Sequence, residues 1–310
     1  MKRLGRLAAK LGDRLVGALV ALVFGALRRI DPDRASDFCG AVARRCGPLL
    51  PVHRLGRANL QAAFPERDQA WIEATLRGVW ENLGRVAGEY VHLGKLWDYD
   101  LERPDPEGRI LVDDAAVRLF MELAGDGKPA LAFASHLANW ELPAVAAAAH
   151  GLPAAVVYRM PNNRSVAAAI TRIRQGLMGR LIRGRAEAVF EMAGALNRGE
   201  HLGMLVDQHW SRGVDVMFFG RRCKANPTLA RLARQYDCPV VGVRVIRLRG
   251  HRFRIDTVGP LALPRAADGQ IDVAGTMQMV TGIVEGWVRE HPEQWLWLHR
   301  RWRPAPGSPR

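Results

Sequence analysis

His136 and Glu141, separated by four residues in the stretch SHLANWE, are the side chains whose types and spacing could do chemistry. The apolar run PALAFA precedes them and predicts a buried strand, so His136 stands where a strand ends and a helix begins. Catalytic sites of open α/β sheets lie at the carboxyl ends of strands. A neutral imidazole there could act as a general base, and a carboxylate folding back could fix its tautomer. The structural alternative is a histidine at a helix start, followed by a first-turn acid that complements the helix dipole.

The rest of the sequence narrows the reaction class. No serine or cysteine stands in a motif typical of a covalent nucleophile, which favours direct attack by a substrate hydroxyl on an activated acyl group. The sequence has no dinucleotide-binding GxGxxG motif, no P-loop and no GxSxG elbow. Its four cysteines form no CxxC pair and no Cys/His cluster, so we predict no metal site and a reduced, cytoplasmic setting.

Polar residues follow two other predicted strands. Arg159 follows a strand at residues 154–158, and Asp207 and Gln208 follow one at residues 202–206. We expect their side chains at the same rim as His136. Arg159 could stabilise an oxyanion or hold a phosphate, and its alternative is a structural ion pair. Asp207 could pair with Arg159 or contact the acceptor, and its alternative is a turn-initiating aspartate.

Three further residues are candidates for binding substrate at this rim. Asn162 and Asn163 follow Arg159 closely and could bound the same cleft, with turn chemistry as the alternative. Arg221 lies in a basic stretch after the FFG turn and could face phosphates, with a solvated basic loop as the alternative.

The elements that must position these residues change in character along the chain. Helical spacing of apolar residues dominates up to about residue 96, and an acidic, proline-rich linker follows. Short apolar strands then alternate with helices, which predicts an α/β fold with a mostly parallel sheet flanked by helices. Strands at residues 240–248 and 253–258 are expected to pair antiparallel. We predict three parts: an N-terminal membrane-associating helix at 1–30, a helical region at 31–96 and the catalytic core at 109–303.

The N-terminal segment and the net charge both bear on partners. Residues 15–27 carry no charge, and as a helix they would span about 20 Å of a roughly 30 Å hydrocarbon layer. Basic residues flank this core, which favours a short or tilted membrane association, with a buried core helix as the alternative. The net charge of +14 favours an anionic partner such as a membrane surface, an acidic protein or nucleic acid. No nucleic-acid-binding motif is recognisable.

The His-x4-Glu motif in SHLANWE resembles that of the late acyltransferases of lipid A biosynthesis, the lauroyl/myristoyl transferase family. These are relatives of the glycerolipid acyltransferases, which carry His-x4-Asp. Further similar blocks run in order from about residue 50 to 303, and Met160 is a small departure within one of them. The blocks are RANLQAAFPE, WENLGRVAGEY, VYRMPNN, MLVDQHWSRGVDVMFFG, PTLARLA and PEQWLWLHRRW.

The resemblance implies transfer of a fatty acyl chain from a thioester of acyl carrier protein or coenzyme A to a hydroxyl of a lipid A precursor. It implies no cofactor beyond this thioester co-substrate, and a place at the cytoplasmic face of the bacterial inner membrane. His136 would be the general base and Glu141 its orienting carboxylate. The alternatives are the same chemistry on another glycolipid or aminolipid, and a basic nucleic-acid-binding protein without enzymatic activity.

Overall fold

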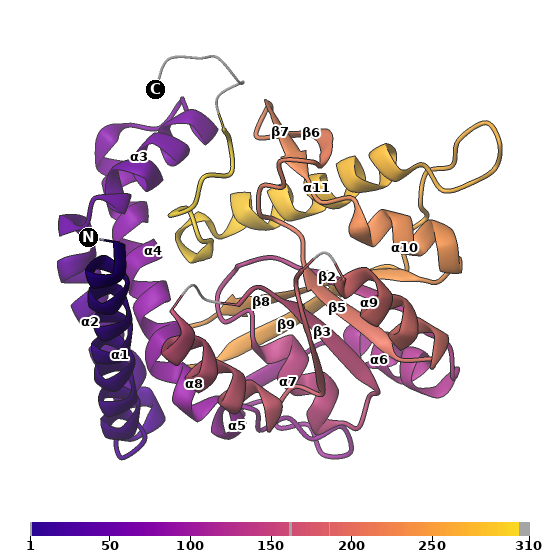
Figure 1. Ribbon diagram of the computed structural model, residues 1–310. Helices are drawn as coiled ribbons and strands as arrows, with labels where there is room; N and C mark the ends of the chain where they lie inside the picture. Colours follow the sequence, from indigo (N-terminus) through magenta and orange to yellow (C-terminus); the bar gives the residue numbers. More distant parts are fainter. Residues whose placement is uncertain (1, 161–162, 186, 304–310) are drawn as a thin grey trace.

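The N-terminal quarter of the protein is a group of helices packed beside the rest of the chain (Figure 1). The computed structural model describes residues 2–160, 163–185 and 187–303. The helices are α1 (Lys2–Leu27), α2 (Pro32–Cys46), η1 (Gly47–Leu49), α3 (Val52–Ala63) and α4 (Gln69–Glu89). Helices α2 and α4 approach closely because α4 has glycines at the contact. A Cβ added at Gly84 would lie 2.3 Å from the carbonyl oxygen of Cys39.

Seven strands form the main sheet, in the order β1-β9-β8-β2-β5-β3-β4. All neighbouring pairs are parallel except β8 and β9, which confirms the predicted mostly parallel sheet and its antiparallel pair. The strands are β1 (Ile110–Val112), β2 (Leu131–Ala134), β3 (Ala154–Tyr158), β4 (Arg180–Arg183), β5 (His201–Leu205), β8 (Val240–Arg247) and β9 (Phe253–Val258).

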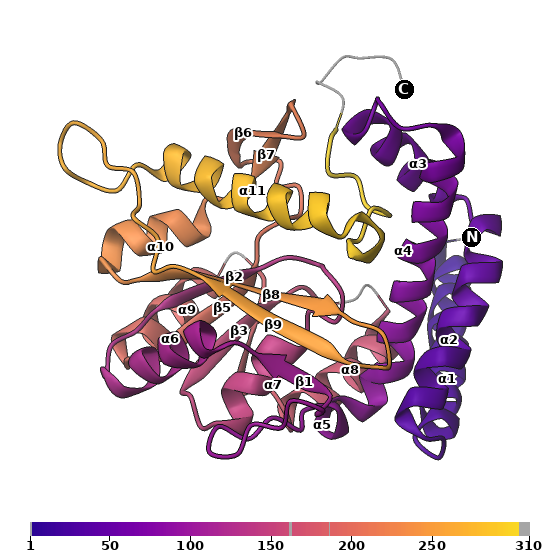
Figure 2. The ribbon, with the colours of Figure 1, turned by 180° about the vertical axis from the view of Figure 1, so that it is seen from behind.

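A separate hairpin and the remaining helices complete the fold. Among the residues that the structure describes, strands β6 (Val214–Phe218) and β7 (Arg221–Ala225) pair only with each other, antiparallel. The helices are η2 (Tyr90–His92), α5 (Leu93–Leu96), α6 (Asp114–Gly125), α7 (Leu142–Ala149), α8 (Arg164–Gln175), α9 (Ala188–Asn197), α10 (Thr228–Tyr236), α11 (Val273–Glu290) and η3 (Pro292–Gln294). Figure 2 shows α10 and α11 on one side of the sheet and α5 and α7 on the other, as expected for a sheet buried on both faces.

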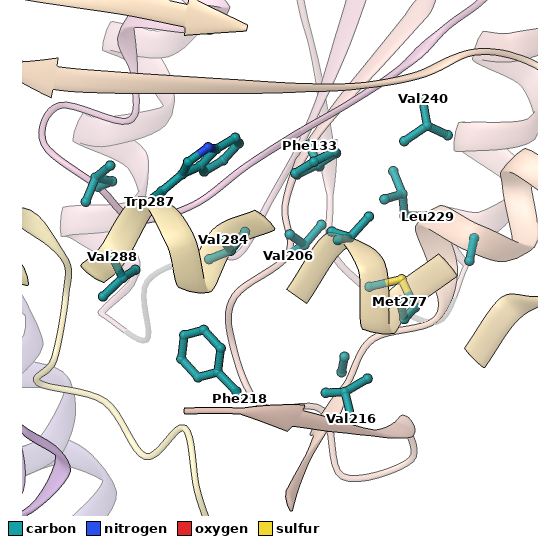
Figure 3. Packing of buried hydrophobic residues seen from close by; sticks show 14 of the residues in the cluster. Phe133, Val206, Val216, Phe218, Leu229, Val240, Met277, Val284, Trp287 and Val288 are labelled. Atoms are coloured by element: carbon teal, nitrogen blue, oxygen red, sulfur yellow. The ribbon is translucent and has the colours of Figure 1, made fainter. Parts of the chain in front are cut away.

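The largest part of the core lies between the sheet, α11 and the hairpin (Figure 3). Phe133 of β2 stacks on Trp287 of α11, with ring centroids 5.6 Å apart. Phe218 and Val216 of the hairpin approach α11 from the other side. Helix α11 therefore lies between two layers, and its buried face joins the hairpin to the sheet.

Helix α1 packs against α8 but leaves apolar side chains in solvent. Val16, Leu19, Leu22 and Val23 are each at least 44% exposed. Within the described residues, no helix combines the length and the apolar character that crossing a membrane requires. Membrane association of the first 30 residues, and the division into three parts, therefore stay predictions.

Candidate active site

His136 lies at the carboxyl end of β2, in the middle of the sheet, as the sequence predicts. Strand β2 pairs in parallel with β5, and Ala134 stands opposite Leu205 in the register. The residues that follow the two strands are therefore neighbours in space. His136 and Asp207 each come two residues after these paired strand ends.

Asp207 is the hydrogen-bond partner of the His136 ring. Its Oδ1 lies 2.8 Å from Nδ1 of His136, and its side chain is completely buried. Its Oδ2 accepts from the backbone N–H of His136 at 2.7 Å and from the indole Nε1–H of Trp295 at 2.7 Å. Burial alone would raise the pKa of Asp207, but attraction to the protonated form of the His136 ring and the hydrogen bonds from the His136 ring and backbone hold the pKa well below its usual range.

This pairing determines the tautomer of His136. An ionised carboxylate can only accept hydrogen bonds, so Nδ1 of the neutral ring carries the proton and Nε2 carries the lone pair. Nε2 lies 3.4 Å from the side-chain amide nitrogen of Gln208. The ring also lies beside Trp140, with 5.2 Å between centroids, and its side chain is 12% exposed. The imidazole is thus held through Nδ1, and its basic Nε2 is directed away from the Asp207 carboxylate.

Glu141 does not make the predicted contact with His136. Its carboxylate is paired with the guanidinium of Arg174 in α8, with Nε–Oε2 at 3.1 Å and Nη2–Oε1 at 2.5 Å. The Arg174 guanidinium also lies over the rings of Tyr90 and Tyr158, 5.8 and 5.4 Å from their centroids. Burial would lower the pKa of Arg174, but the Glu141 charge outweighs it and raises this pKa. The expected contact between Glu141 and His136 is therefore wrong, and the carboxylate that contacts the His136 ring is that of Asp207.

The physical reason for this correction is the direction in which each side chain leaves the turn. Glu141 directly precedes α7 and is buried toward α8, where the Arg174 guanidinium compensates its charge. Asp207 belongs to the neighbouring strand end, and its carboxylate contacts His136. This contact takes the place of the pairing between Asp207 and Arg159 that the sequence analysis considered. Arg174 stands 33 residues after Glu141 in a helix, and no sequence pattern singles it out.

The other predicted substrate-binding residues differ in their surroundings. Arg159 is exposed directly after β3, where its guanidinium makes no hydrogen bond or ion pair with the described part of the chain. Asn163 caps α8, since its Oδ1 accepts from the backbone N–H groups of Ser165 and Val166 at 3.0 Å. Asn162 lies outside the described residues. Arg221, on β7, is exposed with its guanidinium 5.1 Å from the centre of the Trp302 ring.

Of the predicted binding residues in the described chain, hydrogen bonds therefore connect only Asp207 and Gln208 to His136. Sequence reasoning missed Trp295, whose indole N–H holds the second oxygen of Asp207. A tryptophan near the chain end gives no signal of such a contact, because the contact depends on the C-terminal segment pairing with the turn after His136, through the Leu137–Trp295 bridge.

Comparison with known proteins identifies the family of the chain. The family model described as "Bacterial lipid A biosynthesis acyltransferase" matches residues 10–304, nearly the whole chain. The comparison with curated proteins found no match. The family model spans the helices, the sheet and the C-terminal segment that meet at His136. The chain belongs to the bacterial lipid A biosynthesis acyltransferase family.

Proposed function

We propose that His136 is the general base of an acyl transfer from a thioester of acyl carrier protein or coenzyme A to a hydroxyl of a lipid A precursor. The observation that carries this proposal is the Nδ1–Asp207 hydrogen bond of 2.8 Å, which leaves Nε2 as the basic atom. The arrangement has the logic of a base oriented by a buried carboxylate. Asp207, rather than Glu141, holds the ring and stabilises the imidazolium that forms.

The reaction then proceeds in two steps. The acceptor hydroxyl gives its proton to Nε2 of His136 while its oxygen forms a bond to the thioester carbonyl carbon. The tetrahedral intermediate collapses, the carbon–sulfur bond breaks, and the imidazolium returns the proton to the leaving thiolate. General base catalysis contributes about 10²–10⁴-fold, so oxyanion stabilisation and positioning must supply the rest. Arg159, exposed at the end of β3, is our candidate for an oxyanion or phosphate contact.

Glu141 has a different role in this proposal. Its bidentate pair with Arg174 joins the start of α7 to the end of α8. The pair fixes the far end of the SHLANWE turn, so that the histidine and the helix that follows it keep one geometry. In this proposal Glu141 maintains the geometry of the site and takes no part in proton transfer.

The surroundings of the reaction follow from its substrates. An acceptor that carries several acyl chains is insoluble, so the enzyme must meet it at a bilayer surface. The exposed apolar residues of α1, with the exposed Arg28 and Arg29 beyond its end, suit the interface of the cytoplasmic leaflet. The net charge of +14 suits both anionic lipid and an acidic acyl carrier protein.

The test is a defined acyl transfer assay. Purified protein is incubated with an acyl thioester and a lipid A precursor dispersed in detergent, and the lipid is analysed by mass spectrometry. We expect the acceptor to gain one acyl group in place of a hydroxyl hydrogen, and His136→Ala to lose nearly all of this product. If product formed only from another glycolipid or an aminolipid, the proposed acceptor would be wrong and the proposed acyl transfer reaction would stand. Equal product from wild type and His136→Ala would refute the proposed base.

A further inference from the structure

The turn that follows His136 has an unfavourable backbone conformation and is held in it from outside the sheet. Ala138 has a φ of 47°, in the left-handed region that residues other than glycine rarely adopt. It is completely buried, and both of its backbone groups are engaged. Its N–H donates to the carbonyl of Gln294 at 3.0 Å, and its carbonyl accepts from Nδ2 of Asn82 at 3.3 Å. Strain of this kind persists only where the surroundings fix it.

The next residue of the turn is held by the same helix. Asn139 donates from Nδ2 to Oε2 of Glu89 at 2.9 Å, and both side chains are buried. Asn82 and Glu89 are seven residues apart on α4, two helical turns, so they share one face. Arg247 of β8 connects them, since its Nε donates to Oδ1 of Asn82 at 3.0 Å and its Nη2 donates to Glu89 at 2.9 Å.

The ion pair between Glu89 and Arg247 is largely buried, with side chains 3% and 11% exposed. Taking both charges out of water costs free energy that their attraction only partly returns, and such pairs are often replaceable by apolar residues. Burial would raise the pKa of Glu89, yet the Arg247 charge and the hydrogen bonds lower it, so the carboxylate is ionised. An ionised, fully partnered group holds a position with more directional precision than apolar packing does.

We propose that Asn82 and Glu89, joined by Arg247, are positioning residues that hold the turn at residues 137–139 so that His136 meets Asp207. The catalytic consequence rests on the function proposed above. If Ala138 relaxed to negative φ, the chain on either side of it would rotate and His136 would shift. A misplacement of about 1 Å at a reacting group can lower the rate about 10²-fold. The helical N-terminal region therefore contributes to the active site without touching substrate.

The chain offers a matched control. Glu73 also lies on α4 and pairs with an arginine and a histidine, but its partners, Arg57 and His53, belong to α3 and not to the turn. Glu73→Gln therefore removes polar contacts of the same helix while leaving the turn's own bonds in place.

The first arm of the test needs no substrate. Amide hydrogen exchange is followed by mass spectrometry in Asn82→Ala, Glu89→Gln and the Glu73→Gln control. We expect faster exchange in the peptide covering residues 134–142 for the first two variants, with the sheet unchanged, and native exchange there for the control. Should Glu89→Gln not fold, Asn82→Ala carries the test, because it leaves the buried ion pair intact. Unchanged exchange in the turn of Asn82→Ala would overturn the inference.

The second arm measures steady-state kinetics. We expect Asn82→Ala to lower kcat about 10²-fold with little change in KM. Adding Ala138→Gly should recover a large part of this loss, because glycine adopts positive φ without a steric penalty. A loss that Ala138→Gly does not recover, or a kcat within twofold of wild type, would overturn the positioning role. If the wild type transfers no acyl group while the turn still loosens in Asn82→Ala, the proposed function fails and the hold on the turn stands.

Discussion

Asp207→Asn replaces one oxygen by an amide nitrogen, and the structure determines which one. Oδ2 accepts from two N–H donors, the His136 backbone and the Trp295 indole, at 2.7 Å each. An amide nitrogen cannot occupy that place, so the asparagine must direct its oxygen there and its NH₂ group toward Nδ1 of His136. The ring nitrogen that faced an acceptor then faces a donor.

The consequence is a reversal of the His136 tautomer. Nδ1 becomes the acceptor and the proton moves to Nε2, so the nitrogen that must receive the substrate proton is already protonated. Loss of general base catalysis predicts a fall in kcat of about 10²–10⁴-fold. That fall corresponds to about 2.7–5.4 kcal/mol of transition-state stabilisation. The variant should still fold, because the amide keeps the volume of the side chain and two of its three hydrogen bonds.

The assay is single-turnover acyl transfer at saturating donor and acceptor, with thermal unfolding of the same preparations as the control for folding. Asp207→Glu is the companion variant, since it restores the charge but displaces the oxygens by one methylene group. We expect it to be more active than Asp207→Asn at neutral pH. If Asp207→Asn kept a rate within threefold of wild type and a native melting temperature, the assignment of Asp207 as the orienting carboxylate would be wrong.

Three further predictions follow from particular contacts. Glu141→Gln and Arg174→Gln should each lower activity, and the double variant should be at least as active as the less active of the two single variants. If the activity of the double variant instead fell by the product of the two single losses, the two residues would act separately. A protein that begins at Asp31 should move from the membrane pellet to the supernatant yet keep activity on detergent-dispersed acceptor. Release of the full-length protein from the membrane by salt alone would contradict attachment through apolar residues. Burial lowers the pKa values of His201 and His299 in the folded state. The unfolded chain therefore takes up protons near pH 6.5 that the folded chain does not, and the free energy of unfolding should fall below that pH by up to about 1.4 kcal/mol per histidine and pH unit. Urea titrations between pH 7.5 and 5.5 measure this, and a flat stability profile would contradict it.

The sequence predicts the parts of the fold that rest on local apolar patterns. Buried strands such as β2, with LAFA, and β3, with AAVVY, are recognisable as short apolar runs. Strands β4 and β7, with RLIR and RRCKA, are rich in arginine and were not predicted. At a sheet edge or in a hairpin, one side of a strand faces solvent, so polar residues alternate with apolar ones.

The candidate site likewise has one part that local sequence predicts and another part that it does not. That His136 stands at a strand end follows from the residues around it, because a buried strand and a helix start are both local features. Its pairing with Asp207 is not local, since it depends on β2 and β5 lying side by side in the sheet. Glu141 is close in sequence and was therefore chosen as the partner. Proximity along the chain is a poor guide where a turn with a positive φ separates the two residues.

The central claim is that His136 and Asp207 act as one catalytic unit in acyl transfer. A double-mutant cycle of single-turnover rates with wild type, His136→Ala, Asp207→Asn and the double variant tests it most directly. Because the carboxylate acts only through the imidazole, we expect the double variant to be no slower than His136→Ala alone. A double variant whose rate falls by the product of the two single losses would contradict the claim, and so would a His136→Ala enzyme with an undiminished rate.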